Sequence, residues 1–162
     1  MLGDPVLRQP AEEVDTFDDE LRQLIHDMFA VMYAEEGIGL AAPQIGVSKR
    51  FFVMDVGEPG ARAQAIVNPV VVQESGSEKG EEGCLSLPGL VGEVERAAKI
   101  VVEGHDPDGK PLRLEASELV ARCIQHEIDH LDGVLFIDRL SPIKRKLLLS
   151  KWKKRRKEAE RG

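Results

Sequence analysis

Two stretches of the chain carry apolar residues at helical spacing. In the first, between residues 17 and 34, apolar side chains recur every three or four positions, which gathers them on one face of an amphipathic helix. These residues are Leu21, Leu24, Ile25, Met28, Phe29 and Met32. Thr16 and Asp19 have the spacing of a capping box, so we expect Thr16 to cap a helix over residues 17–34. His26 falls off the apolar face and is expected to be solvated.

The second helical stretch lies between Ser117 and Gly133. Serine is favoured at the start of a helix, and glycine is favoured just beyond its end. The apolar positions between them are Leu119, Val120, Cys123, Ile124 and Leu131. This pattern predicts a helix that is largely buried in the protein core.

Between the two helices the pattern changes to short apolar runs rich in β-branched residues, which predict strands. Two such runs are 51–56 and 65–72, and Pro69 inside the second predicts an edge position or a bulge. Residues 106–109, Asp-Pro-Asp-Gly, separate two further runs and predict an antiparallel hairpin. Residues 73–83 are rich in Gly, Glu and Ser, so we expect a mobile or tightly turning connection there.

Residues 37–46 match neither the helical nor the strand pattern. Three glycines and Pro43 favour a loop whose backbone can approach a ligand closely. Gln44 adds an amide that can both donate and accept hydrogen bonds. The stretch lacks the lysine and the glycine spacing of a phosphate-binding loop.

Length and composition indicate one ordinary globular domain. The chain has 162 residues, of which 42% are hydrophobic and 31% are charged. It contains no apolar run of about 18 residues and no secretory signal pattern, so we expect no membrane association. Two cysteines, Cys84 and Cys123, are too few for a disulfide framework. We therefore expect a cytoplasmic protein, in which a cysteine near histidines is a metal ligand or a nucleophile.

The net charge of −7 conceals two regions of opposite sign. Residues 144–162 contain ten Lys and Arg against two Glu, whereas residues 1–143 carry a net charge of −15. We expect residues 1–143 to form the functional body of the protein. Residues 144–162 are expected to form a basic helical tail of the same domain, with Leu147, Leu148, Leu149 and Trp152 at its root.

The chemistry of the chain gathers in residues 125–133, Gln-His-Glu-Ile-Asp-His-Leu-Asp-Gly. His126 and His130 are four positions apart, so on a helix both imidazoles project from one face and can bind one metal ion. Glu127 lies beside the first histidine, where its carboxylate can act as a general base towards a metal-bound water. The alternative is a surface helix with two chance histidines, and a third ligand would decide between the two.

A catalytic metal takes three protein ligands and leaves one position for water. One class of peptidase with this helix takes a third histidine six residues beyond the second, but Phe136 stands at that position. A downstream glutamate would be Glu158 or Glu160, and both lie in the basic tail. Asp138 is a weaker candidate.

The two cysteines differ in their reach towards the histidines. Cys123 lies seven residues before His130, about 10.5 Å along a helix axis, which is too far for one ion to bind both together with His126. We therefore expect Cys123 in the core. Cys84 lies on a separate segment bounded by glycine and proline, and it can approach from across the site. We therefore expect a metal site whose protein ligands are Cys84, His126 and His130, with a fourth position left for water.

Three motifs make the chain similar to the bacterial peptide deformylases. They are Gly37-Ile38-Gly39-Leu40-Ala41-Ala42-Pro43-Gln44, Glu82-Gly83-Cys84-Leu85-Ser86 and Gln125-His126-Glu127-Ile128-Asp129-His130. Their order and spacing make the resemblance specific. It extends over nearly the whole chain, from the Asp4-Pro5-Val6-Leu7-Arg8 opening through the hairpin at 106–109.

The resemblance implies a metal-dependent hydrolase that removes the formyl group from N-formyl-methionyl peptides and releases formate. It implies that Cys84, His126 and His130 hold the metal and that Glu127 is the general acid and base. The family's ion in the cell is Fe2+, and Zn2+ or Ni2+ can occupy the same site. One thiolate and two imidazoles suit all three ions.

The same resemblance implies further roles around the metal. Gln44 and the backbone N–H of Leu85 would stabilise the negative charge that develops on the formyl oxygen. An apolar pocket for the methionine side chain would be lined by Ile38, Leu119 and Cys123. Gly39 would position the peptide backbone, and Glu82 would add to this and support the loop that carries Cys84.

Three alternatives remain beside this hypothesis. A zinc peptidase built on the same helix lacks its own third ligand, and a structural zinc site would need a fourth, for which His105 is the only spare residue. A deformylase-like protein without activity is disfavoured because Glu127, Gln44 and Cys84 are all present.

We expect an α+β fold in which antiparallel sheets wrap around the central metal-binding helix. The 17–34 helix would pack outside, and the basic helix would lie at the C-terminus. We expect a monomer, whose tail is either a solvated helix or a segment that binds ribosomal RNA through its lysines and arginines.

Overall fold

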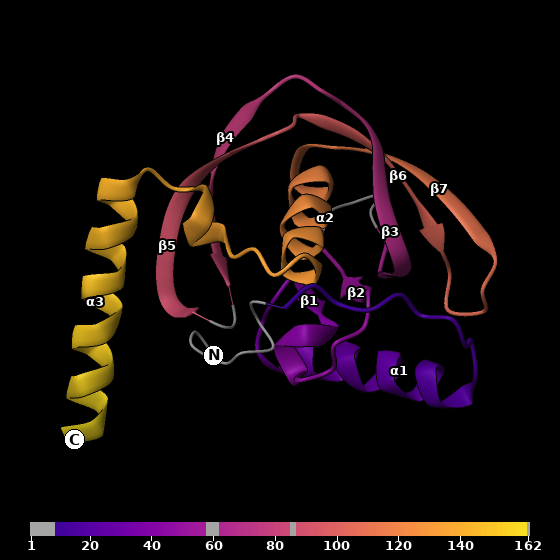
Figure 1. Ribbon diagram of the computed structural model, residues 1–162, viewed down its shortest axis with the longest axis horizontal. Helices are drawn as coiled ribbons and strands as arrows, with labels where there is room; N and C mark the ends of the chain where they lie inside the picture. Colours follow the sequence, from indigo (N-terminus) through magenta and orange to yellow (C-terminus); the bar gives the residue numbers. More distant parts are fainter. Residues whose placement is uncertain (1–8, 58–61, 85–86, 162) are drawn as a thin grey trace.

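The computed structural model describes residues 9–57, 62–84 and 87–161. Side chains are described for all of these except residues 84, 87–90, 152, 155, 156 and 158–161. At the centre of the molecule stands helix α2 (Glu118–Leu131), with strands on both sides of it and helix α1 (Asp19–Ala34) beneath (Figure 1). The basic helix α3 (Pro142–Arg161) stands at one side, next to the two-stranded sheet.

The strands form two antiparallel sheets. The larger sheet has the order β1-β2-β3-β6-β7, and the smaller one is the pair β4-β5. The strands are β1 (Gly39–Ala41), β2 (Phe51–Met54), β3 (Gln64–Ser75), β4 (Glu78–Cys84), β5 (Leu87–Arg96), β6 (Lys99–His105) and β7 (Pro111–Ser117). Two short 3-10 helices, η2 (Ala42–Ile45) and η3 (Phe136–Arg139), follow β1 and α2. This arrangement confirms the predicted α+β fold.

Strand β2 shows how the larger sheet separates two cores. Successive side chains of a strand point to opposite faces, and all four residues of β2 are buried. Phe52 and Met54 face α2, whereas Phe51 and Val53 face α1. The short apolar run in the sequence is therefore a strand covered by a helix on each face.

The C-terminal helix packs against a third and smaller hydrophobic core. Val94 of β5 packs with Leu135, Phe136 and Ile137 of the segment around η3. Leu140, Leu148 and Leu149 pack against this cluster. The apolar root of α3 is thus attached to β5, while Ile143 and Leu147 remain exposed.

Several local expectations are confirmed. The register of the β3–β6 pair shifts between Val67 and Val70, which places a bulge at Pro69. Strands β6 and β7 pair as the predicted hairpin, and Gly109 in the turn has a φ of +85°. Ser117 is the N-cap position of α2, although its side chain makes no capping hydrogen bond, and Gly133 takes the left-handed conformation just beyond the end of the helix. His26 is exposed.

The predicted start of α1 is wrong by two residues. The helix begins at Asp19, and its cap is Asp18, whose carboxylate accepts a hydrogen bond from the Leu21 N–H at 3.0 Å. The Thr16 hydroxyl bonds to Asp15 instead. A carboxylate at this position also interacts favourably with the positive end of the helix dipole.

Two segments expected to lack regular structure are partly regular. Residues 39–45, within the predicted loop, form β1 and η2. Residues 73–83 are mostly strand, because β3 continues to Ser75 and β4 begins at Glu78. Pairing with β6 and β5 overrides the weak strand preference of Gly, Glu and Ser. No helix within the described ranges is long and apolar enough to cross a membrane.

We expect Asp18→Ala to lower the free energy of unfolding by about 1 kcal/mol, because the first turn of α1 loses its acceptor. Urea denaturation followed by circular dichroism measures this loss. Thr16→Ala is the matched control and should change the value by less than about 0.5 kcal/mol. A larger loss for Thr16→Ala than for Asp18→Ala would contradict the cap seen here.

Candidate metal centre

Helix α2 presents two histidines and a carboxylate to one point in space. His126 and His130 are one helical turn apart, and their ring centroids are separated by 5.0 Å. One ligand atom from each of His126, Glu127 and His130 lies within 4.8 Å of the others. All three side chains are buried. The predicted helical pair of imidazoles is therefore confirmed as a cluster that could hold a metal ion.

Glu82 of β4 fixes the orientation of the first histidine. Its Oε1 lies 2.8 Å from Nδ1 of His126. Burial alone would raise the pKa of Glu82, but hydrogen bonds from Arg96 and His126 outweigh it and lower the pKa to about 2. A charged carboxylate can only accept hydrogen bonds, so Nδ1 carries the proton. Nε2 then becomes the nitrogen whose lone pair can bind a metal.

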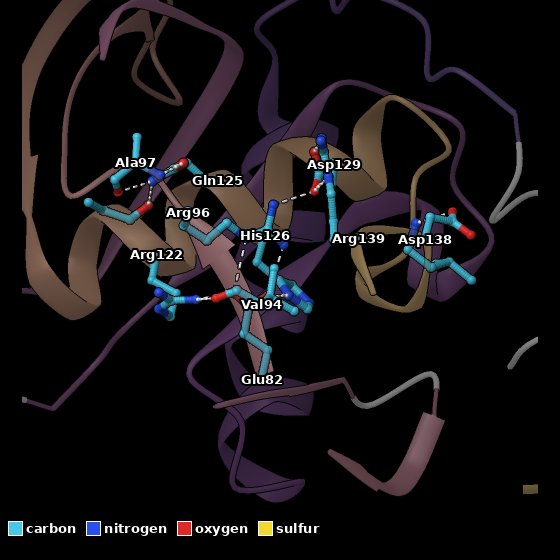
Figure 2. A network of polar contacts seen from close by, with 12 residues as sticks. Glu82, Val94, Arg96, Ala97, Arg122, Gln125, His126, Asp129, Asp138 and Arg139 are labelled. Carbon is cyan, nitrogen blue, oxygen red and sulfur yellow. Dashed lines mark hydrogen bonds and ion pairs between the residues drawn. The ribbon is translucent and has the colours of Figure 1, made fainter. Parts of the chain in front are cut away.

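The Glu82 carboxylate is saturated by donors from two other side chains as well. Arg96 of β5 donates from Nε and Nη2 to its two oxygens, each at 2.9 Å. Arg122 of α2 donates from Nη1 to Oε2 at 2.6 Å. Together with the contact from His126, the carboxylate accepts four hydrogen bonds from three side chains, which is close to its full accepting capacity. Figure 2 shows these partners converging on Glu82.

The network continues from Arg96 to Asp129 of α2 and on to η3. Nη1 of Arg96 donates to Oδ2 of Asp129, which belongs to the same motif as the histidines. Arg139 of η3 donates to both oxygens of Asp129, at 3.1 Å from Nε and 2.7 Å from Nη2. A continuous chain of charge-assisted hydrogen bonds therefore joins η3 to His126 (Figure 2).

Glu127 has a different environment from Glu82. It is buried, and this burial raises its pKa to about 7. Its Oε1 has no hydrogen-bond partner within the described part of the chain. A carboxyl group in such a setting is poised to take up and release a proton near neutral pH.

The β1 strand approaches Glu127 closely because residue 39 is glycine. A Cβ atom at Gly39 would overlap Oε2 of Glu127 and lie 2.9 Å from Sγ of Cys123. Cys123 Sγ is also 3.6 Å from the carbonyl oxygen of Ile38. The structure thus brings Ile38, Gly39, Cys123 and Glu127 together beside the histidines.

The remaining predicted site residues are placed as follows. Gln44 lies on η2, and its Oε1 accepts a hydrogen bond from the Ala41 N–H at 2.8 Å, which makes the NH2 the donor end of the amide. Leu119 is half-buried in the first turn of α2. Cys84 is the last residue of β4, but its side chain lies outside the described residues. Leu85 lies outside them altogether.

The donor set fits a divalent metal ion. Burial lowers the pKa of His130 to about 3, which keeps its imidazole neutral and able to bind a metal. Phe136, at the position where one peptidase class has its third histidine, is 1% exposed and packs 6.3 Å from the His126 ring. Position 136 therefore supplies no ligand to this cluster.

Sequence reasoning missed most of the polar network that supports the histidines. The hydrophobic pattern along the chain gives no indication of the three arginines in this network, Arg96, Arg122 and Arg139. Each is separated from its partner carboxylate by 10 to 40 residues. Asp129 could have been suspected, because it stands between the two histidines inside the motif. Buried acidic residues almost always have a partner, but the sequence does not name it.

Comparison with known proteins gives one consistent result. The family model described as polypeptide deformylase matches residues 1–146. A peptide deformylase from Acidothermus cellulolyticus is 55% identical over 92% of this chain and 81% of its own length. One from Brucella suis is 51% identical over 95% of this chain and 90% of its own length.

Solved structures agree with the sequence comparison. A peptide deformylase from Legionella pneumophila is 46% identical and has a TM-score of 0.92, covering 99% of this chain and 95% of that chain. A peptide deformylase from Synechococcus elongatus, solved in complex with actinonin, is 47% identical with a TM-score of 0.88. That match covers 93% of this chain and 84% of the other.

We expect Glu82→Gln to weaken metal binding about 10- to 100-fold, because the neutral amide no longer fixes the His126 ring. Competition with a fluorescent chelator measures the affinity. Glu81→Gln is the matched control, since Glu81 is the exposed neighbour on the same strand. Equal affinities for the two variants would show that the contact with Glu82 does not support metal binding.

Proposed function

Because the chain belongs to the polypeptide deformylase family, we propose that Cys84, His126 and His130 hold one divalent metal ion and that Glu127 transfers the proton in catalysis. The chain is a metal-dependent hydrolase that removes the N-formyl group from polypeptides and releases formate. The observation that carries the assignment of residues is the buried His126, Glu127 and His130 cluster, with His126 oriented by Glu82.

Glu127 is the proton carrier of the proposed mechanism. A metal ion held by Cys84, His126 and His130 would supply Lewis-acid chemistry, polarising the formyl carbonyl and lowering the pKa of a water molecule towards neutrality. Glu127 accepts the proton from the attacking water and then donates it to the leaving amine nitrogen, so one carboxyl group serves as base and then as acid. Burial, which raises the pKa of Glu127 to about 7, supports both steps.

Gln44 and the backbone N–H of Leu85 are proposed to stabilise the oxyanion. The hydrogen bond that Gln44 Oε1 accepts from Ala41 holds the amide in place and leaves its NH2 group as the donor. Donors held in advance cost no reorganisation when charge develops on the formyl oxygen. Losing one such donor typically costs about 2.7–4 kcal/mol of transition-state stabilisation.

The methionine side chain of the substrate is proposed to lie against Ile38, Leu119 and Cys123. The close approach of Cys123 Sγ to the Ile38 carbonyl oxygen places α2 and the start of β1 beside each other next to Glu127. Gly39 would position the peptide backbone. Glu82, which is 6% exposed and saturated by four donors, would act by supporting the segment that carries Cys84.

We propose Fe2+ as the ion bound in the cell. One thiolate and two imidazoles form a set of intermediate softness, which accepts ferrous iron as well as zinc or nickel. A thiolate beside ferrous iron is susceptible to oxidation, because it can be converted to sulfenic acid and further. The proposal therefore includes loss of activity in air.

The basic tail is proposed to hold the enzyme near the source of its substrate. The packing of Leu148 and Leu149 on the cluster around η3 supports the proposal that residues 144–162 belong to the same domain as the body. The exposed lysines of α3 can bind the phosphates of ribosomal RNA where nascent chains emerge. We propose that a monomer acts there, in the cytoplasm.

We expect Glu127→Gln to lower formate release from a formyl-Met-Ala peptide about 10²- to 10⁴-fold, because the amide cannot transfer the proton. The protein is purified without oxygen and loaded with iron, and metal content is measured in parallel. Glu115→Gln, at an exposed position of β7, is the control and should keep parent activity. Parent-like formate release by Glu127→Gln would remove Glu127 from the mechanism.

Truncation after Leu149 should abolish cosedimentation with ribosomes at low salt and leave formate release from the short peptide unchanged. The expected reason is the loss of phosphate contacts made by the lysines and arginines beyond this residue. The parent protein should dissociate from ribosomes as the salt concentration rises. If the truncated chain still cosediments, the tail is not the docking segment.

A further inference from the structure

The β4–β5 hairpin is joined to the rest of the fold without a shared strand. Its two strands pair only with each other in the described residues, whereas the other five strands form one continuous sheet. In Figure 1 the hairpin stands on the opposite side of α2 from β3, β6 and β7. The placement of the hairpin therefore depends on side-chain contacts, which are the packing of Val94 on the segment around η3 and the polar contacts with α2.

Some of these contacts hold the base of the hairpin, away from Cys84. Gln125 of α2 donates from Nε2 to the Ala97 carbonyl oxygen and accepts from the Ala97 N–H through Oε1, at 2.9 and 3.0 Å. Arg96 is bonded to Asp129. Both contacts lie at the end of β5, where the chain leaves the hairpin for β6. They anchor the base of the hairpin to α2, and Arg96 also holds Glu82 of β4 through two hydrogen bonds.

Arg122 is bonded to both strands of the hairpin at once. Its Nη1 donates to Oε2 of Glu82 at 2.6 Å and to the Val94 carbonyl oxygen at 2.9 Å. Its Nη2 donates to the Glu78 carbonyl oxygen at 2.8 Å. Two of these acceptors belong to β4, at positions 78 and 82. A planar guanidinium that bonds to both therefore aligns the strand up to two residues before Cys84.

The hairpin accommodates this guanidinium because residue 80 is glycine. A Cβ atom at Gly80 would lie 2.9 Å from both Cζ and Nε of Arg122 and 3.1 Å from Nη2. The Arg122 side chain is only 12% exposed, so the bonds from Nη1 to Glu82 and Val94 are partly shielded from competing water. Arg122 also precedes His126 by four residues and lies on the same side of α2.

We propose that Arg122 is a positioning residue of the metal centre, which sets the placement of the hairpin carrying Cys84 relative to the helix carrying His126 and His130. The proposal rests on the ligand set given under the proposed function. Metal–ligand distances tolerate deviations of about 0.2 Å, so a small rotation of β4 would remove the thiolate from the ion's reach. Lysine cannot replace the arginine fully, because its ammonium is a single point that cannot span acceptors on two strands.

The test uses the Co2+-loaded protein, in which coordination by a thiolate produces a charge-transfer absorption band. We expect Arg122→Met to weaken the band and to lower metal affinity about 10- to 100-fold, measured by chelator competition. At saturating metal, kcat should fall by a large factor while KM changes little, because the substitution affects the metal geometry and not the peptide pocket. Arg122→Lys should fall between Arg122→Met and the parent. Arg113→Met removes an exposed arginine paired with Glu103, and it should match the parent.

A second variant displaces the guanidinium without changing Arg122. Gly80→Ala places a methyl group against it, and we expect the same weakening of the band and of metal affinity. In the double variant the effects should not add, because the alanine then has no guanidinium to displace. This cycle remains informative if Arg122→Met folds poorly, since Gly80→Ala retains every charge.

The outcomes separate the positioning role from the proposed ligand set. If the parent lacks the cobalt–thiolate band, or Cys84→Ser retains it, the ligand set itself is overturned. If the parent shows the band and Arg122→Met has parent affinity, spectrum and kcat, only the positioning role is overturned. Additive losses for Gly80→Ala and Arg122→Met would also overturn it. Non-additive losses with a weakened band support it.

Discussion

The neutralisation of one buried carboxylate, Glu82, determines how the parts of this protein meet. Removing an ionised carboxylate from water costs several kcal/mol, and this cost is offset only if partners occupy its oxygens. Here the partners come from β5 and α2, so burying Glu82 requires the hairpin and the central helix to adopt one relative position. The same contacts orient His126. The contacts that hold the hairpin against α2 in the folded protein are therefore also the contacts that orient His126.

The two glutamates beside His126 have opposite environments, and we propose that these environments give them different tasks. Glu82 receives four donors and keeps its charge, with a pKa of about 2. Glu127 is buried without such compensation, and its pKa rises to about 7. A permanently charged group suits the orientation of a histidine, whereas a group that titrates near neutrality suits proton transfer. The chemistry thus follows from environment, because the two side chains are identical.

The features that local sequence predicted well are those whose cause is local. The spacing of His126 and His130 on a helix, the bulge at Pro69 and the left-handed Gly133 follow from geometry within a few residues. The prediction for residues 73–83 was wrong because their strand structure comes from pairing with β5 and β6. The prediction that Thr16 caps α1 was wrong. Thr16 and Asp18 can both accept a hydrogen bond from the first turn of a helix, and local spacing does not decide between them.

The sequence by itself determined the chemical character of this protein. Two histidines and a glutamate in one helical motif, with a distant cysteine and glutamine in recognisable motifs, specified the family and its metal-dependent reaction. Only the tertiary structure decided which charged groups hold the histidines in place. Arg96 and Arg122 meet Glu82 from positions 14 and 40 residues away. Such pairings depend on how sheets and helices pack, and no local pattern in the chain encodes them.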